Sequence, residues 1–336
     1  MRKYIFIIFF VLVGICFFAS DLYTPIKRTI EVTGNFGEYR SISKNLAVSE
    51  HYNLGMGIST GGITGVNVYS PGKGYVESIS VNDPLYGHTV SVVLPNQKNV
   101  ITNEMGIKVM FAHIEGAGSS ESSDTRKLDK IFDMLLSGSS VKFKKMGFNP
   151  NEIEVFDGQL IAQSGDSGNV PPYLHIEIMD KSETMYINPD IYYDFGNPET
   201  SIIIDKIKIG SNEYALNSGE KPIISIRQGQ NIYLHSAVKL RYNISPKKIQ
   251  LFFENNLVYE IDFERISVSD SFEPGEVYYD STNSDYWFKM NSNSQSSVIT
   301  VNDWFNVDMG FSHEAKIIVT DNWGNTSSRS FVLNYE

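Results

Sequence analysis

Short β-rich runs separated by glycine and proline fill most of this 336-residue chain, and this pattern constrains the fold more than any other feature. From Gly34 to Tyr193 the runs include GVNVYSPGKGYVESISV, HTVSVVL and KVMFAHI, which carry the β-branched and aromatic residues typical of strands. Beyond Phe195, runs such as KIQLFFE and LVYEIDF alternate apolar and polar residues between polar turns, as in a β-sandwich. The length allows two cores, so we predict an all-β protein with domains at residues 32–195 and 200–336.

One segment departs from the β pattern. In SSDTRKLDKIFDMLLSG the apolar residues recur at helical spacing, with Ser123 or Asp124 as a plausible N-cap and Gly138 as a stop. The apolar residues are Leu128, Ile131, Phe132 and Leu135. We predict one surface helix inserted in the first domain.

The first 20 residues have the layout of a secretory signal. Arg2 and Lys3 are followed by an apolar run from Tyr4 to Phe18 and by the small residues Ala19 and Ser20. The run is shorter than the roughly 20 residues that a membrane-spanning helix needs. We therefore predict export to the periplasm or cell envelope, and favour a cleaved signal over an uncleaved N-terminal anchor, the only segment expected to contact the membrane. Residues 21–31 then form a short lead-in.

The charge and the cysteine content exclude several classes of protein. The chain has 28 Lys and Arg against 39 Asp and Glu, a formal net charge of -11, which disfavours binding to nucleic acid or to anionic lipid. The one cysteine, Cys16, lies inside the apolar run, so a cleaved protein has no disulfide framework. Ile15 is not the small residue that lipidation of this cysteine requires, so we rank a lipoprotein below signal cleavage.

Each of three strand-like segments contains a histidine. The segments are HYNLGMGIST, VMFAHI and PPYLHIEI. Period-two geometry places Tyr173, His175 and Glu177 on one face of a strand, where His175 and His113 could form a two-histidine polar site. A single histidine of this kind is more often a hydrogen-bonded residue of a half-buried sheet. These residues alone therefore leave both interpretations open.

The order of the segments resembles that of the lysostaphin and LytM-type zinc metallopeptidases. The resemblance spans Gly34 to Tyr193, roughly half of the chain, and several segments match in register, which is far more specific than any one motif. The matching segments are GNFGEYR, T-x-x-x-x-G, VYSPGKGYV, FAHI, GQLIAQSGDSG, PPYLHIEI and INPDIYY. The resemblance implies a duplicated hybrid-motif β domain with the helix inserted, and substrates that are cross-bridges or stem peptides of peptidoglycan. We expect an immunoglobulin-like sandwich to follow it.

The same resemblance exposes missing zinc ligands. In that family the histidine and aspartate of H-x-x-x-D bind zinc together with the second histidine of H-x-H. Alignment on Gly55 puts Asn53 and Gly57 at the first two ligand positions and leaves His175 at the third. A register that uses His51 as a ligand puts Gly55 at the aspartate position, so a ligand is still missing.

The catalytic positions are also altered. The resemblance places His113 at a retained catalytic position and Tyr173 where the family has the first histidine of H-x-H. His51 and Glu177 are expected in the cleft as accessory residues. Catalytic zinc takes three protein ligands and one open position, so we expect no tight zinc site and no cofactor. Rescue of the metal site by Asp166 or Glu177 is the alternative, with zinc as the cofactor.

Three functions are therefore compared. The leading interpretation is a catalytically degenerate envelope protein that binds peptidoglycan or a partner such as a cell-wall hydrolase. The first alternative is an active zinc endopeptidase with a rebuilt site, which predicts bound metal and cleavage of peptidoglycan peptides that is lost when His113 or His175 is replaced. The second is an adhesion or assembly protein, whose function would be removed by deleting Ser201 to Glu336.

Overall fold

The structure is a computed structural model that describes residues 22–41, 49–117, 123–137, 142–150, 152–217, 219–291, 293, 295–308 and 310–336. The predicted secretory signal and the predicted helix stop at Gly138 lie outside these residues. Within them, no helix is long and apolar enough to cross a membrane.

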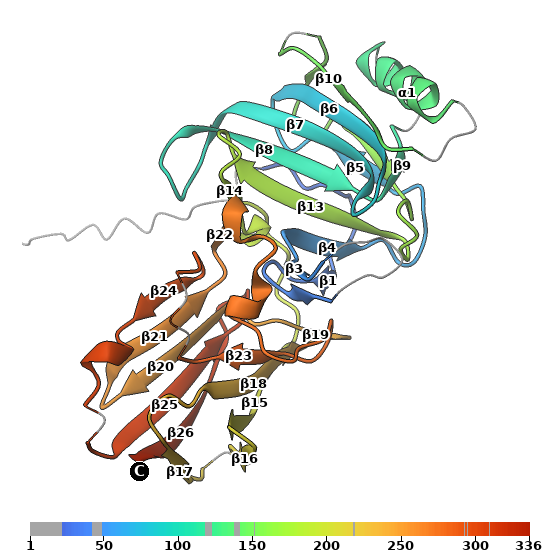
Figure 1. The fold of residues 1–336 in the computed structure, drawn as a ribbon. Coiled ribbons are helices and arrows are strands. Elements are labelled where there is room, and N and C mark those ends of the chain that lie inside the picture. The colour runs from blue at the N-terminus through green and yellow to red at the C-terminus, as the bar shows by residue number, and fades with distance from the viewer. Residues whose placement is uncertain are drawn as a thin grey trace, which may run out of the picture.

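A large antiparallel sheet forms the framework of the first domain (Figure 1). Its main path is β1 (Val32–Gly34), β4 (Gly55–Ser59), β13 (Tyr173–Asp180), β8 (Met105–Ala112), β7 (Gly87–Lys98), β6 (Gly74–Asp83) and β10 (Lys144–Gly147). β11 (Glu154–Val155) and β14 (Met185–Ile187) extend it at the sides. A second sheet contains β5 (Asn67–Tyr69), β12 (Leu160–Ser164) and β9 (Ile114–Gly116), and a short ribbon pairs β2 (Tyr39–Arg40) with β3 (His51–Tyr52).

The alternation of residues along β13 decides which face of the large sheet is polar. Leu174 and Ile176 are fully buried, and Ile176 pairs with the fully buried Phe111 of β8. Because neighbouring residues of a strand point to opposite faces, His175 and Glu177 lie on the other side of the sheet from this core. The sheet therefore presents its histidine and carboxylate on one polar face.

The inserted helix is α1 (Ser123–Leu136), as predicted. Its residues Leu128, Phe132 and Leu135 are buried, and the helix packs beside β6 and β12 at the edge of the domain (Figure 1). The helical spacing of its apolar residues is thus explained by packing on the two sheets.

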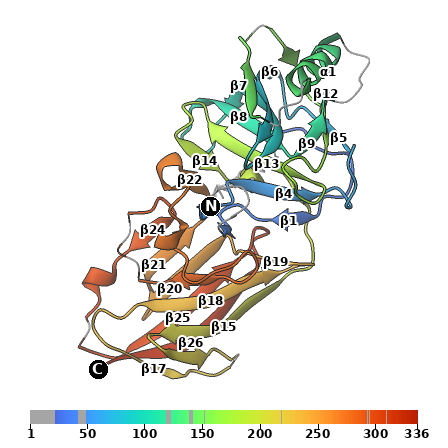
Figure 2. The same cartoon turned by 45° about the vertical axis from the view of Figure 1, so that its right-hand side comes forward.

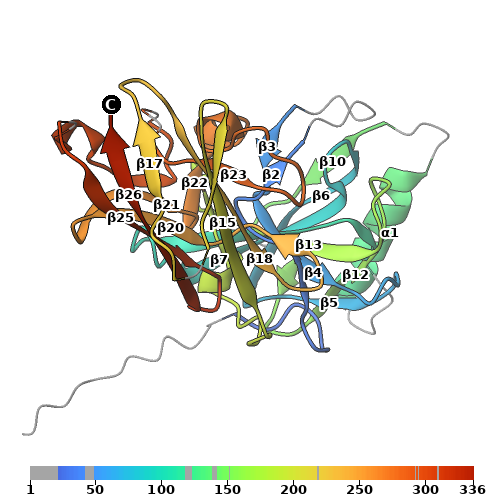
Figure 3. The same cartoon turned by 90° about the horizontal axis from the view of Figure 1, so that it is seen from below.

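The second part of the chain is a β-sandwich, whose two sheets lie against each other (Figure 3). One sheet contains β16 (Asn212–Ala215), β15 (Ser201–Ile209), β18 (Ile232–Lys239), β19 (Asn243–Ile244) and β23 (Trp287–Lys289). The other contains β17 (Ile223–Ile226), β26 (Thr326–Tyr335), β25 (His313–Thr320), β20 (Lys248–Phe253), β21 (Asn256–Asp262) and β24 (Ile299–Asn302). Short 3₁₀ turns are η1 (Pro189–Ile191), η2 (Val268–Asp270), η3 (Pro274–Glu276) and η4 (Trp304–Asn306). The predicted all-β fold with one helix and a sandwich is confirmed.

The two parts of the chain share one hydrophobic core. β22 (Arg265–Ser267), from the second part, pairs with β14 of the first. The Tyr278 hydroxyl donates to the carbonyl of Gly37 at 2.7 Å, and the Asn35 amide donates to the carbonyl of Ser245 at 2.8 Å. Figures 1 and 2 both place β19 beside β1 and β4. The sandwich therefore borders the part of the first domain that carries the predicted site.

Candidate functional site

The residues at the predicted ligand positions meet where β4 and β13 pair. Gly57 of β4 lies opposite His175 of β13, and His175 lies opposite Ala112 of β8 on its other side. Tyr173 is two residues before His175, so both side chains emerge from the same polar face. The sheet register thus places these positions side by side.

His113 lies immediately after β8 and is held in a left-handed backbone conformation, with φ 58°. Its backbone amide donates to the carbonyl of Tyr86 at 3.0 Å and its carbonyl accepts from Gly165 at 2.9 Å, which holds this uncommon conformation in place. Its ring Nδ1–H donates to the carbonyl of Ser167 at 2.9 Å. The ring lies 4.8 Å from the Tyr173 ring and 6.0 Å from the His175 ring, centre to centre.

Burial sets the protonation of His113. The ring is almost completely buried, and this burial, together with the nearby His175, lowers the pKa of His113 from 6.5 to about 4. The imidazole is therefore neutral at physiological pH. Because its Nδ1 already donates to a carbonyl, the lone pair is on Nε2.

His175 belongs to a buried hydrogen-bonded chain. Its Nε2 lies 3.0 Å from Oε1 of Glu177, and the Tyr86 hydroxyl also hydrogen-bonds this carboxyl group. Burial raises the pKa of Tyr86 well above its usual value, so the phenol keeps its proton and donates it. Since the carboxylate oxygen accepts, the Nε2–H of His175 is the donor in this contact. A carboxylate behind a histidine is the arrangement that orients metal ligands, but it serves equally to satisfy a buried imidazole.

The two replaced ligand positions are filled by other groups. The Asn53 amide nitrogen donates to the carbonyl of Asn35 at 2.6 Å, so it is used in fixing the chain before β2. A Cβ added to Gly57 would lie 2.9 Å from Oγ1 of Thr33, 3.3 Å from the backbone nitrogen of Gly34 and 3.4 Å from the Tyr173 ring. Strand β1 therefore takes the space that an aspartate side chain would need.

A guanidinium group lies next to these positions. Arg40 forms an ion pair of 2.8 Å with the buried Glu38, whose other oxygen accepts from the backbone nitrogen of Ser245 at 3.1 Å. A Cβ added to Gly34 would meet Nη2 of Arg40 at 2.8 Å and Nδ2 of Asn53 at 3.5 Å, so the two side chains converge on the same spot. A fixed positive charge there opposes a divalent cation. We did not predict Arg40 as a site residue, although it lies within the matched segment GNFGEYR.

These residues line an open cleft of about 600 Å³ between the two parts of the chain. Asn53, Gly57, Tyr173 and His175 form part of its wall, with Arg40 and strand β1. The lining also includes Arg241 and Tyr242, from the turn between β18 and β19. No motif in the sequence marks these two turn residues, because they reach the cleft only through the packing of the sandwich.

His51 and Glu177, which we predicted in the cleft, do not line it. His51 pairs with Arg40 between β2 and β3, its Nδ1 contacts the carbonyl of Ser49 at 2.9 Å, and burial lowers its pKa. Glu177 lines a separate cavity of about 180 Å³ with Tyr86. Both residues therefore lie outside the cleft lining.

The residues present do not fit a catalytic zinc ion. Within the ranges that the structure describes, no group of three His, Cys, Asp or Glu side chains is placed to hold a metal. Asn53 is already hydrogen-bonded, Gly57 has no side chain and no room for one, and Asp166 is exposed outside the cleft lining. A zinc site needs three protein ligands, and the cleft supplies one at His175.

Comparison with known proteins gives a limited result. No family model and no curated protein matches the chain. Among solved structures, the chain is similar to the catalytic domain of the prophage-encoded M23 protein EnpA from Enterococcus faecalis, determined as a single-residue mutant. The identity is 15%, the TM-score is 0.31, and the alignment covers 51% of this chain and 98% of that domain.

Proposed function

We propose that this protein is a non-catalytic binding protein of the cell envelope, whose cleft binds peptidoglycan or a partner such as a cell-wall hydrolase without zinc. The crowding at Gly57 carries the proposal, because Thr33 and Gly34 take the place of the second metal ligand. The resemblance in sequence to the lysostaphin-type peptidases supports peptidoglycan as the ligand. Residues 1–20 then serve as the export signal, which cell fractionation tests.

The chemistry of the cleft suits a peptide that carries carboxylate groups. Arg241 is exposed in the cleft lining, and its guanidinium lies 5.5 Å from the centre of the Tyr242 ring. Arg40, which is paired with Glu38 at 2.8 Å, adds a second guanidinium to the lining, which also includes Tyr173. Guanidinium groups bind carboxylates through paired hydrogen bonds, and the stem peptides of peptidoglycan carry both carboxylates and amides.

Binding to purified peptidoglycan tests the proposal directly. We expect the protein to cosediment with peptidoglycan, and the double variant Arg241→Ala with Tyr242→Ala to bind about tenfold more weakly, because two anchors of the cleft are lost. Both residues are exposed, so folding should be unaffected. The matched control is Arg265→Ala, which removes an exposed arginine that does not line the cleft. Equal binding by the double variant and the control would contradict the proposal.

Metal analysis separates this function from an active peptidase. After zinc loading and desalting, we expect elemental analysis to find no retained zinc in the protein or in its His175→Ala variant. Near-stoichiometric zinc that disappears with His175→Ala, together with peptide release that is abolished by His113→Ala, would establish the peptidase instead.

A further inference from the structure

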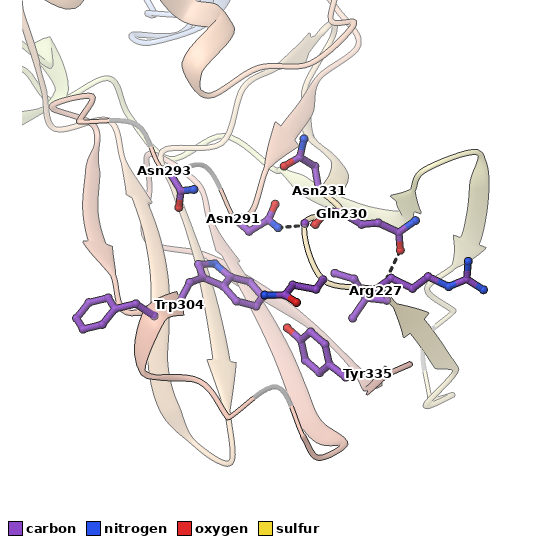
Figure 4. A pocket seen from close by; sticks show the side chains of 11 residues that line it. Arg227, Gln230, Asn231, Asn291, Asn293, Trp304 and Tyr335 are labelled. Atoms are coloured by element: carbon purple, nitrogen blue, oxygen red, sulfur yellow. Dashed lines mark hydrogen bonds between the residues drawn. The ribbon is translucent and has the colours of Figure 1, made fainter.

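A second candidate site lies in the sandwich, at the end that carries the C-terminus and is remote from the first domain in Figures 1 and 2. A cavity of about 280 Å³ is formed there by the loop between β17 and β18, by Asn291 and Asn293, by η4 and by the end of β26 (Figure 4). A cavity of about 400 Å³ adjoins it and shares Asn293, Trp304 and Phe305. Together they form what we call the sandwich groove, whose size is in the range of ligand sites.

The aromatic rings of Trp304 and Phe305 line both cavities. The Trp304 indole is fixed, because Nε1 donates to the carbonyl of Met290 at 2.7 Å and the Phe253 ring packs against it at 5.3 Å. The next residue, Phe305, is 83% exposed. Most of this phenyl ring is therefore open to a ligand at the edge of the groove.

The polar groups of the sandwich groove are neutral and partly preorganised. Asn291 is fixed, since its Oδ1 accepts from Ile232 at 2.9 Å and its Nδ2 donates to the carbonyl of Gln230 at 2.8 Å. Gln228 lines the groove as an exposed amide, which offers both donors and an acceptor. Figure 4 shows Asn231, Asn291 and Asn293 above Trp304 and the ring of Tyr335 below it.

The Tyr335 hydroxyl adds a second, independent observation. This oxygen is buried at the cavity wall, yet it has no hydrogen-bond partner among the residues that the structure describes. Burial raises the pKa of Tyr335 to about 12, so the group is a neutral donor. Buried polar groups are nearly always satisfied, and a ligand hydroxyl in the groove would satisfy this one.

The charges decide the class of ligand. Arg227 is the one charged side chain in the groove lining that the structure describes, it lies 3.7 Å from the Glu336 carboxylate, and it points away from Trp304 (Figure 4). An anionic ligand would have no buried cation to bind and would meet a protein of net charge -11.

We propose that the sandwich groove binds an uncharged oligosaccharide. The apolar face of a sugar ring would pack on Phe305, beside the largely buried Trp304, and its hydroxyl groups would pair with Gln228 and the Tyr335 hydroxyl. This inference does not depend on the cleft, which lies in another part of the molecule and is lined by other residues.

The test is calorimetric titration of the purified protein with a panel of uncharged oligosaccharides at millimolar concentration. The panel contains glucose oligomers in both anomeric linkages, mannose oligomers and N-acetylglucosamine oligomers. We expect binding of at least one of these sugars, accompanied by a change in tryptophan fluorescence from Trp304. Binding should weaken at least about tenfold in Phe305→Ala.

Two variants separate a binding role from a structural one. Phe311→Ala is the matched control, because Phe311 is 67% exposed but lines neither cavity. Tyr335→Phe removes only the unpaired hydroxyl, so it should leave the melting temperature unchanged or raised while weakening sugar binding several-fold. Absence of binding by the whole panel would overturn the proposal. Binding that Phe305→Ala and Tyr335→Phe leave unchanged would overturn it as well.

Discussion

Substitution of Gly57 by alanine tests the claim that strand β1 closes the second ligand position. The added Cβ would lie 2.9 Å from Oγ1 of Thr33 and 3.3 Å from the nitrogen of Gly34, both nearer than ordinary contact. The side chain of Thr33 is β-branched and the nitrogen of Gly34 belongs to the backbone, so neither atom moves away easily from the added Cβ. Overpacking of this kind costs about 1 to 3 kcal/mol. Replacing glycine by alanine recovers about 0.4 to 1 kcal/mol from the unfolded chain, so the clash dominates.

We therefore expect Gly57→Ala to lower the free energy of unfolding by about 0.5 to 2 kcal/mol, measured by urea denaturation. The matched control is Gly147→Ala in β10, where the nearest atom, the Glu77 carbonyl oxygen, would be 3.8 Å from the new Cβ. That variant should be neutral or slightly more stable. In a Thr33→Ala background the cost of Gly57→Ala should fall by about 0.5 to 1 kcal/mol, because the nearest atom is gone. A Gly57→Ala protein as stable as the parent would refute the crowding, and with it the main support for a metal-free cleft.

Two further predictions concern acid stability and cooperativity. The pKa of His113 is lowered to about 4, so between about pH 6.5 and pH 4 the unfolded chain binds a proton that the folded chain does not. Acidification through this window should lower the free energy of unfolding by up to about 3 kcal/mol. The His113→Asn variant should lose less stability, as urea denaturation at pH 6.5 and pH 4 would show. Equal losses in the two proteins would contradict the lowered pKa of His113. The two parts of the chain should unfold together, because they share one core and β14 pairs with β22. All three tryptophans lie in the sandwich, so their fluorescence follows the unfolding of that part alone. The fluorescence transition should coincide with the transition in far-ultraviolet circular dichroism, which follows both parts. Two separate transitions would contradict the shared core.

The sequence allowed much of the fold to be predicted, because its patterns are local. The alternation along residues 173–180 identifies which side chains project from the polar face of the sheet. This prediction needs only the geometry of a strand. The helical spacing from Leu128 to Leu135 likewise identifies α1. Such periodicities survive in any tertiary context in which one face is buried.

The parts of the site that escaped prediction depend on contacts between distant segments. Arg241 and Tyr242 line the cleft because the turn between β18 and β19 packs against the first domain. The crowding at Gly57 depends on the pairing of β1 with β4, and the sequence could show only that the aspartate was missing. The sandwich groove combines residues from several separate segments, none of which carries a motif. Distances across such segments are set by packing, and a single sequence does not encode them in any local pattern.

On the predicted alignment, the residues that match the pattern of the lysostaphin-type peptidases are weaker evidence on function than those that depart from it. His175, Glu177 and Tyr86 form a buried hydrogen-bonded chain, and removing one member would leave a buried polar group unsatisfied at a cost of about 1 to 3 kcal/mol. Stability alone therefore accounts for their presence, with or without chemistry. This cost does not account for Asn53 and Gly57, which stand at two predicted ligand positions. In the proposed function, the guanidinium groups of Arg40 and Arg241 and the rings of Tyr173 and Tyr242 line a water-accessible cleft that binds a ligand without zinc.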